Sequence, residues 1–140
     1  MATTNENKKF IQLITTNNFI GKGNFGEVHG PCVWKKKICA VKRRSCGELD
    51  KCKKEYEACK KWMSLCHKNL VTVYDVSFEP PALYIAMEYG SGRSLRSVLG
   101  KCSSALPEQI LTDWSIQIAR GMAYLHGKMI VHRDLKSSNG

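Results

Sequence analysis

The sequence predicts an α+β fold: a five-stranded antiparallel sheet with one helix, followed by further helices. Runs of β-branched and aromatic residues, separated by Gly and Pro, fill most of the chain up to Tyr89. One segment rich in Lys, Glu and Ala interrupts them, which is typical of a helix. After Gly90-Ser91-Gly92 the apolar residues change to helical spacing. The chain therefore divides into a sheet-rich part and a helical part.

In the sheet-rich part, an apolar alternation from Phe10 to Ile14 leads into a glycine cluster, and 26–34 and 37–43 are the next strands. Gly30-Pro31 predicts a bulge or bend inside the first of these two. The helix is expected over 48–65. Two further strands, 70–78 and 83–89, flank Glu79-Pro80-Pro81 and so predict a hairpin-like pair.

In the helical part, Ser94 is a possible N-cap for a short helix over 94–99. A longer helix is expected from Leu106-Pro107 to about Leu125, and 129–131 is a short strand or a loop. The apolar residues at helical spacing in the longer helix are Ile110, Leu111, Trp114, Ile118, Met122 and Leu125.

Composition excludes several classes of protein. No leader-like segment and no apolar stretch of membrane-spanning length occurs among the 140 residues, so we expect a cytoplasmic protein without a membrane partner. The net charge is +10, and from Lys35 to Lys68 there are 12 Lys and Arg against four Asp and Glu. This basic stretch carries no interleaved aromatic platform and no nucleic-acid-binding motif, so it is interpreted as a solvated face rather than a nucleic-acid-binding surface.

The seven cysteines recur almost every seven residues up to Cys66, but no C-x-x-C pair or metal-ligand spacing is present. Cys52, Cys59 and Cys66 fit one helix face. We expect all seven to be structural or incidental thiols, without a metal and without disulfide bonds.

A glycine-rich motif of the form G-x-G-x-x-G-x-V is the first functional candidate. Strand-like sequence follows it, whereas a dinucleotide-binding turn would be followed by a helix. It therefore predicts a strand–turn–strand flap whose backbone N–H groups approach phosphate, or a hairpin without a ligand. Its candidate binding residues are Gly21, Lys22, Gly23, Phe25, Gly26 and Val28.

Cys39-Ala40-Val41-Lys42 places a lysine inside an apolar strand. An ammonium there needs anionic partners, such as phosphates and a carboxylate, and Ala40 would leave room for a flat adenine ring. The alternative is a surface lysine at a strand end. Glu57 is the preferred carboxylate partner of Lys42, with Glu55 as the alternative.

The strand 83–89 runs into the glycine-rich joint. The carbonyl of Glu88 and the N–H of Gly90 could bind a heterocycle, with Met87 filling the space behind it. A plain core strand entering a loop would look similar, so this signal is weak by itself.

The most specific motif is His132-Arg133-Asp134-Leu135-Lys136-Ser137-Ser138-Asn139, which fits H-R-D-L-x-x-x-N in full. With it, the chain from about Thr15 to Asn139 resembles a eukaryotic protein kinase. The last five residues of the motif are similar to the tyrosine-kinase-like group of serine/threonine kinases. Four further places in the chain resemble the transforming-growth-factor-β-activated kinase and its mixed-lineage relatives, which are kinase kinase kinases. These places are Trp34, Met87-Glu88-Tyr89, Gly92-x-Ser94-Leu95 and Val98-Leu99.

This resemblance implies a kinase N-lobe over 15–89, preceded by a polar arm over 1–14, and a C-lobe that begins at residue 90 with a hinge, two helices and the catalytic loop. It implies ATP and Mg²⁺ as cofactors. Asp134 is then the residue that accepts the substrate hydroxyl proton, Lys136 steadies the γ-phosphate, and Asn139 is a Mg²⁺ ligand.

The sequence given ends one residue after Asn139, before any D-F-G segment, activation loop or substrate-binding lobe. We therefore expect a serine/threonine kinase fragment that is inactive by itself. The alternative is a non-catalytic module that binds a nucleotide or a partner. The implied partners are a protein substrate, such as a downstream kinase, and regulatory proteins.

Overall fold

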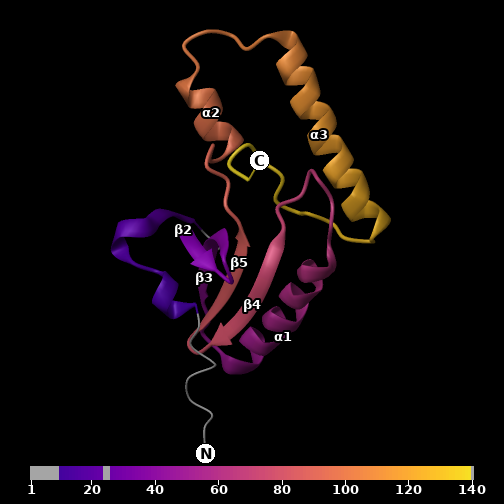
Figure 1. Ribbon diagram of the computed structural model, residues 1–140. Helices are drawn as coiled ribbons and strands as arrows, with labels where there is room; N and C mark the ends of the chain where they lie inside the picture. Colours follow the sequence, from indigo (N-terminus) through magenta and orange to yellow (C-terminus); the bar gives the residue numbers. More distant parts are fainter. Residues whose placement is uncertain (1–9, 24–25, 140) are drawn as a thin grey trace, which may run out of the picture. The chain divides into compact units, whose positions relative to one another are not determined.

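The computed structural model describes residues 10–23 and 26–139, which form two compact units. The first unit contains the chain up to Cys66 and Val71–Tyr89, and the second contains His67–Leu70 and the residues from Gly90 onward. Figure 1 shows the sheet with helix α1 in the first unit and helices α2 and α3 in the second. The predicted α+β class is confirmed.

Five antiparallel strands form one sheet in the order β1-β2-β3-β5-β4. The strands are β1 (Phe19–Gly23), β2 (Gly26–Trp34), β3 (Lys37–Ser45), β4 (Val73–Glu79) and β5 (Ala82–Glu88). The bulge expected at Gly30-Pro31 is present, because the β2–β3 register shifts between His29 and Cys32. The strand predicted from residue 70 begins only at Val73, since the N–H of Leu70 is used in a turn to the carbonyl of His67.

The helices begin close to their expected positions. They are α1 (Leu49–Lys60), α2 (Leu95–Lys101) and α3 (Glu108–Gly127). The Ser94 N-cap is confirmed, since its side chain accepts a hydrogen bond from the N–H of Ser97. The helix predicted to reach residue 65 instead tightens after Lys60 into a 3₁₀ turn over Lys61–Ser64.

Residues 129–131 form a loop, not a strand. Met129 has φ +60°, and its N–H bonds the carbonyl of His126 while the N–H of Ile130 bonds the carbonyl of Leu125. These bonds are those of a Schellman motif, which ends α3.

The sheet has two buried faces. On one, α1 contacts β4 and β5 and covers a cluster of Cys59, Val76, Leu83 and Ile85. We call this the α1 face. The opposite face, which we call the Phe10 face, carries a cluster centred on Phe10, Val41 and Tyr84. Successive residues of a strand point to opposite faces, so the alternation along β5 supplies both clusters.

Phe10 lies in the segment that was assigned to a polar arm, yet its side chain is fully buried. Its ring lies 4.6 Å from that of Trp34, measured between centroids. The buried carboxylate of Glu79 accepts hydrogen bonds from the N–H groups of Phe10 (3.0 Å) and Ile11 (3.2 Å). Phe10 is thus part of the core of the first unit, although it lies within the range expected for the polar arm.

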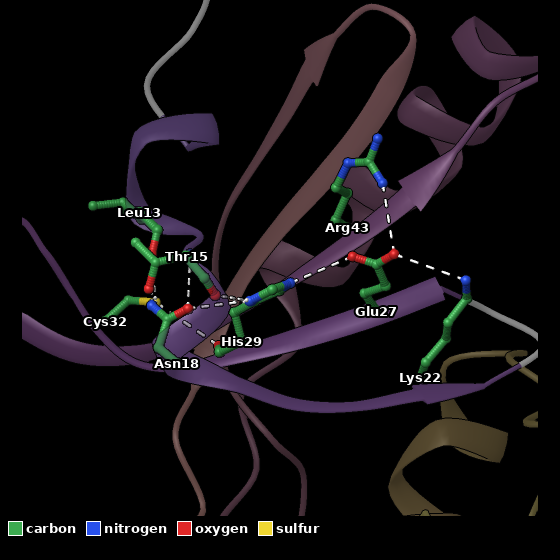
Figure 2. A network of polar contacts seen from close by, with 8 residues as sticks. All are labelled: Leu13, Thr15, Asn18, Lys22, Glu27, His29, Cys32 and Arg43. Atoms are coloured by element: carbon green, nitrogen blue, oxygen red, sulfur yellow. Dashed lines mark hydrogen bonds and ion pairs between the residues drawn. The ribbon is translucent and has the colours of Figure 1, made fainter.

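A polar network continues this attachment (Figure 2). The Asn18 amide donates to the carbonyl of Leu13 at 2.7 Å and accepts from the N–H of Thr15 at 2.9 Å. The buried His29 ring lies 3.0 Å from the Thr15 carbonyl and 3.1 Å from the Asn18 amide oxygen. The segment before β1 is therefore bonded to β2 through its polar groups as well as packed on it.

The prediction of seven unpaired cysteines is wrong at two positions. Cys46 and Cys52 form a disulfide with Cα atoms 5.7 Å apart. The bond joins the residue after β3 to the first turns of α1, two places that only the tertiary fold brings together. The other five are thiols, and burial raises the pKa of Cys32, Cys39 and Cys59.

In the part of the chain that the structure describes, no helix is long and apolar enough to cross a bilayer.

Candidate active site

The sheet register gathers several predicted binding residues on the α1 face. Val28 on β2 lies opposite Lys42 on β3, and Ala40 on β3 lies opposite Met87 on β5. Paired residues of antiparallel strands point to the same face, and so do residues two apart on one strand. Gly21 on β1 is in turn opposite Val28. Strands far apart in sequence thus bring a lysine and small or apolar side chains to one surface.

The three glycines of the glycine-rich motif differ in the space that an added Cβ atom would find beside them. A Cβ added at Gly21 or Gly23 would meet no heavy atom within 4 Å, so the space beside them is open. Gly26 has φ +114°, and a Cβ there would collide with the carbonyl oxygen of Arg43. Gly26 is therefore required by the β2–β3 pairing itself. Phe25, also predicted to bind, lies outside the described residues.

Gly26→Ala is expected to lower the free energy of unfolding by about 2 kcal/mol or more, because the new methyl group collides with β3 in a strained backbone conformation. Gly23→Ala is the matched control in the same motif and should change stability by roughly 0.5 kcal/mol or less. Urea unfolding of the two variants measures the difference. Equal stabilities would contradict the assigned role of Gly26.

The preferred partner of Lys42, Glu57, pairs with a lysine of its own helix. Its carboxylate is 3.0 Å from Nζ of Lys60, and its side chain is 65% exposed. Glu55, the alternative, is half-buried, 3.5 Å from the guanidinium of Arg44. Since Arg44 follows Lys42 by two residues on β3, both point to the α1 face. The helix orientation therefore favours Glu55.

The pKa of the Cys59 thiol depends on the charges of Glu55, Arg44 and Lys42. Burial raises its pKa most, the negative charge of Glu55 raises it further, and the positive charges of Arg44 and Lys42 lower it. Glu55, Arg44 and Lys42 thus all lie close enough to act on one sulfur atom. We call Lys42, Arg44 and Glu55 the charge cluster.

Lys22 extends away from the charge cluster. Its ammonium lies 4.0 Å from the carboxylate of Glu27, which is also 3.9 Å from Arg43 and 3.5 Å from the ring of His29 (Figure 2). Arg43 alternates with Lys42 and so points to the Phe10 face. The side chain of Lys22 is 72% exposed and joins a network that braces three neighbouring strands, β1, β2 and β3.

The predicted hinge residues fall at the boundary between the two units. Glu88 is the last residue of β5 and makes two hydrogen bonds with Thr72. The Thr72 N–H donates to the Glu88 carboxylate at 3.2 Å, and the Glu88 N–H donates to the Thr72 carbonyl at 2.8 Å. Gly90 begins the second unit, where its carbonyl accepts a hydrogen bond from the N–H of Arg93 at 3.1 Å.

In the second unit, the catalytic-loop residues converge on one carboxylate. One oxygen of Asp134 lies 3.2 Å from Nζ of Lys136, and the other accepts a hydrogen bond of 2.9 Å from the Asn139 amide. The same amide donates to the Asp134 carbonyl at 2.8 Å, and the Asp134 N–H donates to Nδ1 of His132 at 3.2 Å. The three residues predicted to share a site in this loop are therefore in direct contact.

These contacts keep Asp134 ionised. The hydrogen bond from Asn139, followed by that from Lys136, lowers the pKa of its carboxyl group. Arg133, just before it, has φ +64°, a conformation that costs a non-glycine residue about 1–2 kcal/mol. The loop is also held from α2, since the N–H of Arg96 donates to the Ser137 carbonyl at 2.8 Å. Sequence reasoning missed this backbone contact, which no motif signals.

Carboxylate and amide oxygens are ligands that Mg²⁺ prefers, so Asp134 and Asn139 fit a site for this ion in their donor chemistry. No cluster of three or more His, Cys, Asp or Glu side chains that could hold a metal occurs among the residues the structure describes. The donor set resembles those in which a bound phosphate completes the coordination of Mg²⁺.

Comparison with known proteins gives one family. The family described as "Protein kinase domain" matches residues 14–139. The chain is 37% identical over 134 residues to mitogen-activated protein kinase kinase kinase 10 of Xenopus laevis, covering 90% of the chain and 13% of that protein. It is 34% identical over 137 residues to mitogen-activated protein kinase kinase kinase 11 of Homo sapiens, covering 92% and 16%. An Arabidopsis thaliana protein, mitogen-activated protein kinase kinase kinase 3, is 35% identical over 127 residues, covering 86% and 21%. The chain thus spans about a fifth or less of the length of these relatives.

Proposed function

Because the chain belongs to the protein kinase family, we propose that it forms the nucleotide-binding part and the catalytic loop of a serine/threonine protein kinase. The reaction is transfer of the γ-phosphoryl group of Mg-ATP to a protein hydroxyl. The convergence of Lys136 and Asn139 on the carboxylate of Asp134 is the observation that carries the proposal.

The first unit supplies the nucleotide side. Its sheet register supports a surface for a flat heterocycle made by Val28, Ala40 and Met87, with Lys42 beside it to bind phosphate oxygens. The open space at Gly21 and Gly23 fits a phosphate chain approached by backbone N–H groups. Lys22 and Gly26 would contribute through the backbone only, because the Lys22 side chain pairs with Glu27.

The hinge residues Glu88 and Gly90 would bind the heterocycle through the carbonyl and the N–H predicted for them. Glu55 would hold Lys42 in place. Its position on α1 supports this role, whereas the exposed pair of Glu57 with Lys60 does not.

The second unit supplies the acceptor side. Asp134 is ionised, so it can accept a hydrogen bond from a substrate hydroxyl and take up its proton. Lys136, 3.2 Å from Asp134, would use its charge to stabilise the oxygen atoms of a transferring phosphoryl group. Mg²⁺, when bound, neutralises charge that develops on the phosphates, and Asn139 and Asp134 are the residues of this loop that would face it.

The likeness to mitogen-activated protein kinase kinase kinases supports a place in a signalling cascade, with another kinase as the protein substrate and regulatory proteins as further partners. A cytoplasmic location, expected from the sequence, is part of this proposal. The alternative, a non-catalytic module that binds a nucleotide or a partner, predicts Mg-ATP binding without transfer.

The proposal is tested by incubating the longest natural product that carries this sequence with γ-labelled Mg-ATP and a mixture of protein substrates. Label on serine or threonine, removed when Mg²⁺ is chelated, is the expected result. Nucleotide binding without transfer would favour the non-catalytic module, and absence of both would overturn the proposal.

The two candidate glutamates can be separated by matched variants on the same helix. Glu55→Gln is expected to weaken Mg-ATP binding about tenfold, since Lys42 loses the carboxylate that orients it. Glu57→Gln should leave the affinity within about twofold. Isothermal titration measures both, and the reverse order would restore Glu57 as the partner.

A further inference from the structure

The Cys46–Cys52 disulfide is a chemical group that no proposed step of phosphoryl transfer uses. It bridges the short connection between β3 and α1, with six residues of sequence separation. In reducing compartments, disulfides are usually transient and respond to the redox state. A disulfide next to the charge cluster is therefore a candidate for control of that cluster.

The first turn of α1 is largely exposed, apart from Cys52. Two of its residues, Cys52 and Cys59, are buried. Its N-cap residue, Glu48, makes no side-chain capping bond, and Leu49 is 55% exposed. The covalent bond at Cys52 thus fixes the beginning of α1 to the residue after β3.

The two cysteines of the disulfide lie on the same strand face and the same helix face as the residues of the charge cluster. On the strand side, Lys42, Arg44 and Cys46 succeed one another at intervals of two residues, and Cys46 packs on the α1-face cluster. On α1, Glu55 follows Cys52 by three residues and so lies on the same helix face. A bond that fixes Cys52 against Cys46 therefore also sets how close Glu55 lies to Arg44, now 3.5 Å.

We propose that Cys46 and Cys52 form a thiol–disulfide exchange site, and that its reduction by a low-molecular-weight thiol releases the first turn of α1 and with it Glu55. The consequence for nucleotide binding at Lys42 rests on the function proposed above.

The exchange takes place in two steps. A thiolate attacks Sγ of Cys46, which is half-buried, whereas Cys52 is only 2% exposed. The S–S bond breaks, and Cys52 leaves as a thiolate that takes up a proton. A second thiolate then attacks the sulfur of the small molecule in the mixed disulfide, and Cys46 is released and protonated. Two thiols become one small-molecule disulfide, while the protein gains two electrons and two protons.

The state of the bond is followed first by alkylation and peptide mapping of the folded chain in glutathione buffers of increasing reducing power. Cys46 and Cys52 should be protected together in oxidising buffer and become alkylated together on reduction. Cys66 and Cys102, which are exposed thiols, should react in every buffer. Alkylation of Cys46 and Cys52 in the folded chain under oxidising conditions would overturn the proposal.

Hydrogen exchange then tests the release of α1. Reduction should speed exchange of amides in the first turns of α1 about tenfold or more, while amides of α3 remain unchanged. The double variant Cys46→Ser, Cys52→Ser should exchange like the reduced chain in all buffers, and the control Cys66→Ser, Cys102→Ser should respond like the wild type. Equal exchange of α1 in both redox states would overturn the proposal.

Mg-ATP affinity separates this inference from the proposed function. The reduced chain should bind about fivefold or more weakly than the oxidised chain. If α1 is released but affinity is equal in both states, the link from the disulfide to the charge cluster is wrong. If α1 is released and neither state binds Mg-ATP, the exchange site stands and the proposed nucleotide function falls.

Discussion

Replacing Asp134 by Asn is expected to lower the rate of phosphoryl transfer about 10²–10⁴-fold. The carboxylate is the group on which Lys136 (3.2 Å) and Asn139 (2.9 Å) converge, and an amide cannot take up the proton of a substrate hydroxyl. Because Asn has nearly the same shape, the loop should keep its fold. The rate is measured on the longest natural product that carries this sequence, with saturating Mg-ATP.

Asp113→Asn is the control for this variant. Asp113 is a carboxylate on the exposed surface of α3 that accepts a hydrogen bond of 2.9 Å from Gln109. Its replacement should leave the rate within about twofold. A rate for Asp134→Asn that matches this control would show that Asp134 is not the proton acceptor.

Phe10→Ala is expected to lower the free energy of unfolding of the first unit by about 3–5 kcal/mol. The ring is fully buried against Trp34 and belongs to the cluster on the Phe10 face. Its loss would also loosen the N–H groups that satisfy the buried carboxylate of Glu79, which is 4% exposed. Urea unfolding followed by circular dichroism measures the change.

Phe19→Ala is the matched control, because it removes the same ring from a position that is 50% exposed. It should cost roughly 1 kcal/mol or less. Similar costs at the two positions would mean that the segment before β1 does not contribute to the core as described.

The case of Phe10 shows why part of the fold escaped sequence reasoning. Strands and helices were predictable where several apolar residues repeat at one period, as they do along β5 and α3. Phe10 is the first large apolar residue after a polar stretch, and its contacts with Trp34 and Glu79 join positions far apart in sequence. No local period reports such contacts, so sequence patterns alone do not predict that Phe10 is buried.

Two sequence arguments give different glutamates as the partner of Lys42. The kinase motif spacing, about nine residues back from His67, lands on Ala58, with Glu57 one residue away and Glu55 three. In the structure α1 gives way to a 3₁₀ turn after Lys60, within this interval. The shared face of Cys52 and Cys59 was recognised, and Glu55 falls between them on that face whereas Glu57 does not. Helical geometry and motif spacing therefore favour different glutamates, and the variants Glu55→Gln and Glu57→Gln distinguish them.

The disulfide could not be predicted in this way. Cys46 follows a strand and Cys52 lies on a helix, so their distance depends on how the intervening turn folds. The catalytic loop was the opposite case. Asp134, Lys136 and Asn139 are so close in sequence that a compact loop alone brings them into contact.

The central claim, that Lys42 belongs to a site for Mg-ATP, is tested most directly by thermal unfolding with and without the nucleotide. At a concentration about 100 times Kd, binding should stabilise the wild-type chain by about 2.7 kcal/mol, and so raise its Tm by several degrees. Lys42→Met should fold but lose this rise. Lys37→Met, on the same strand beside Tyr74, should keep it. A wild-type Tm that does not respond to Mg-ATP, or an equal rise in Lys42→Met, would contradict the claim.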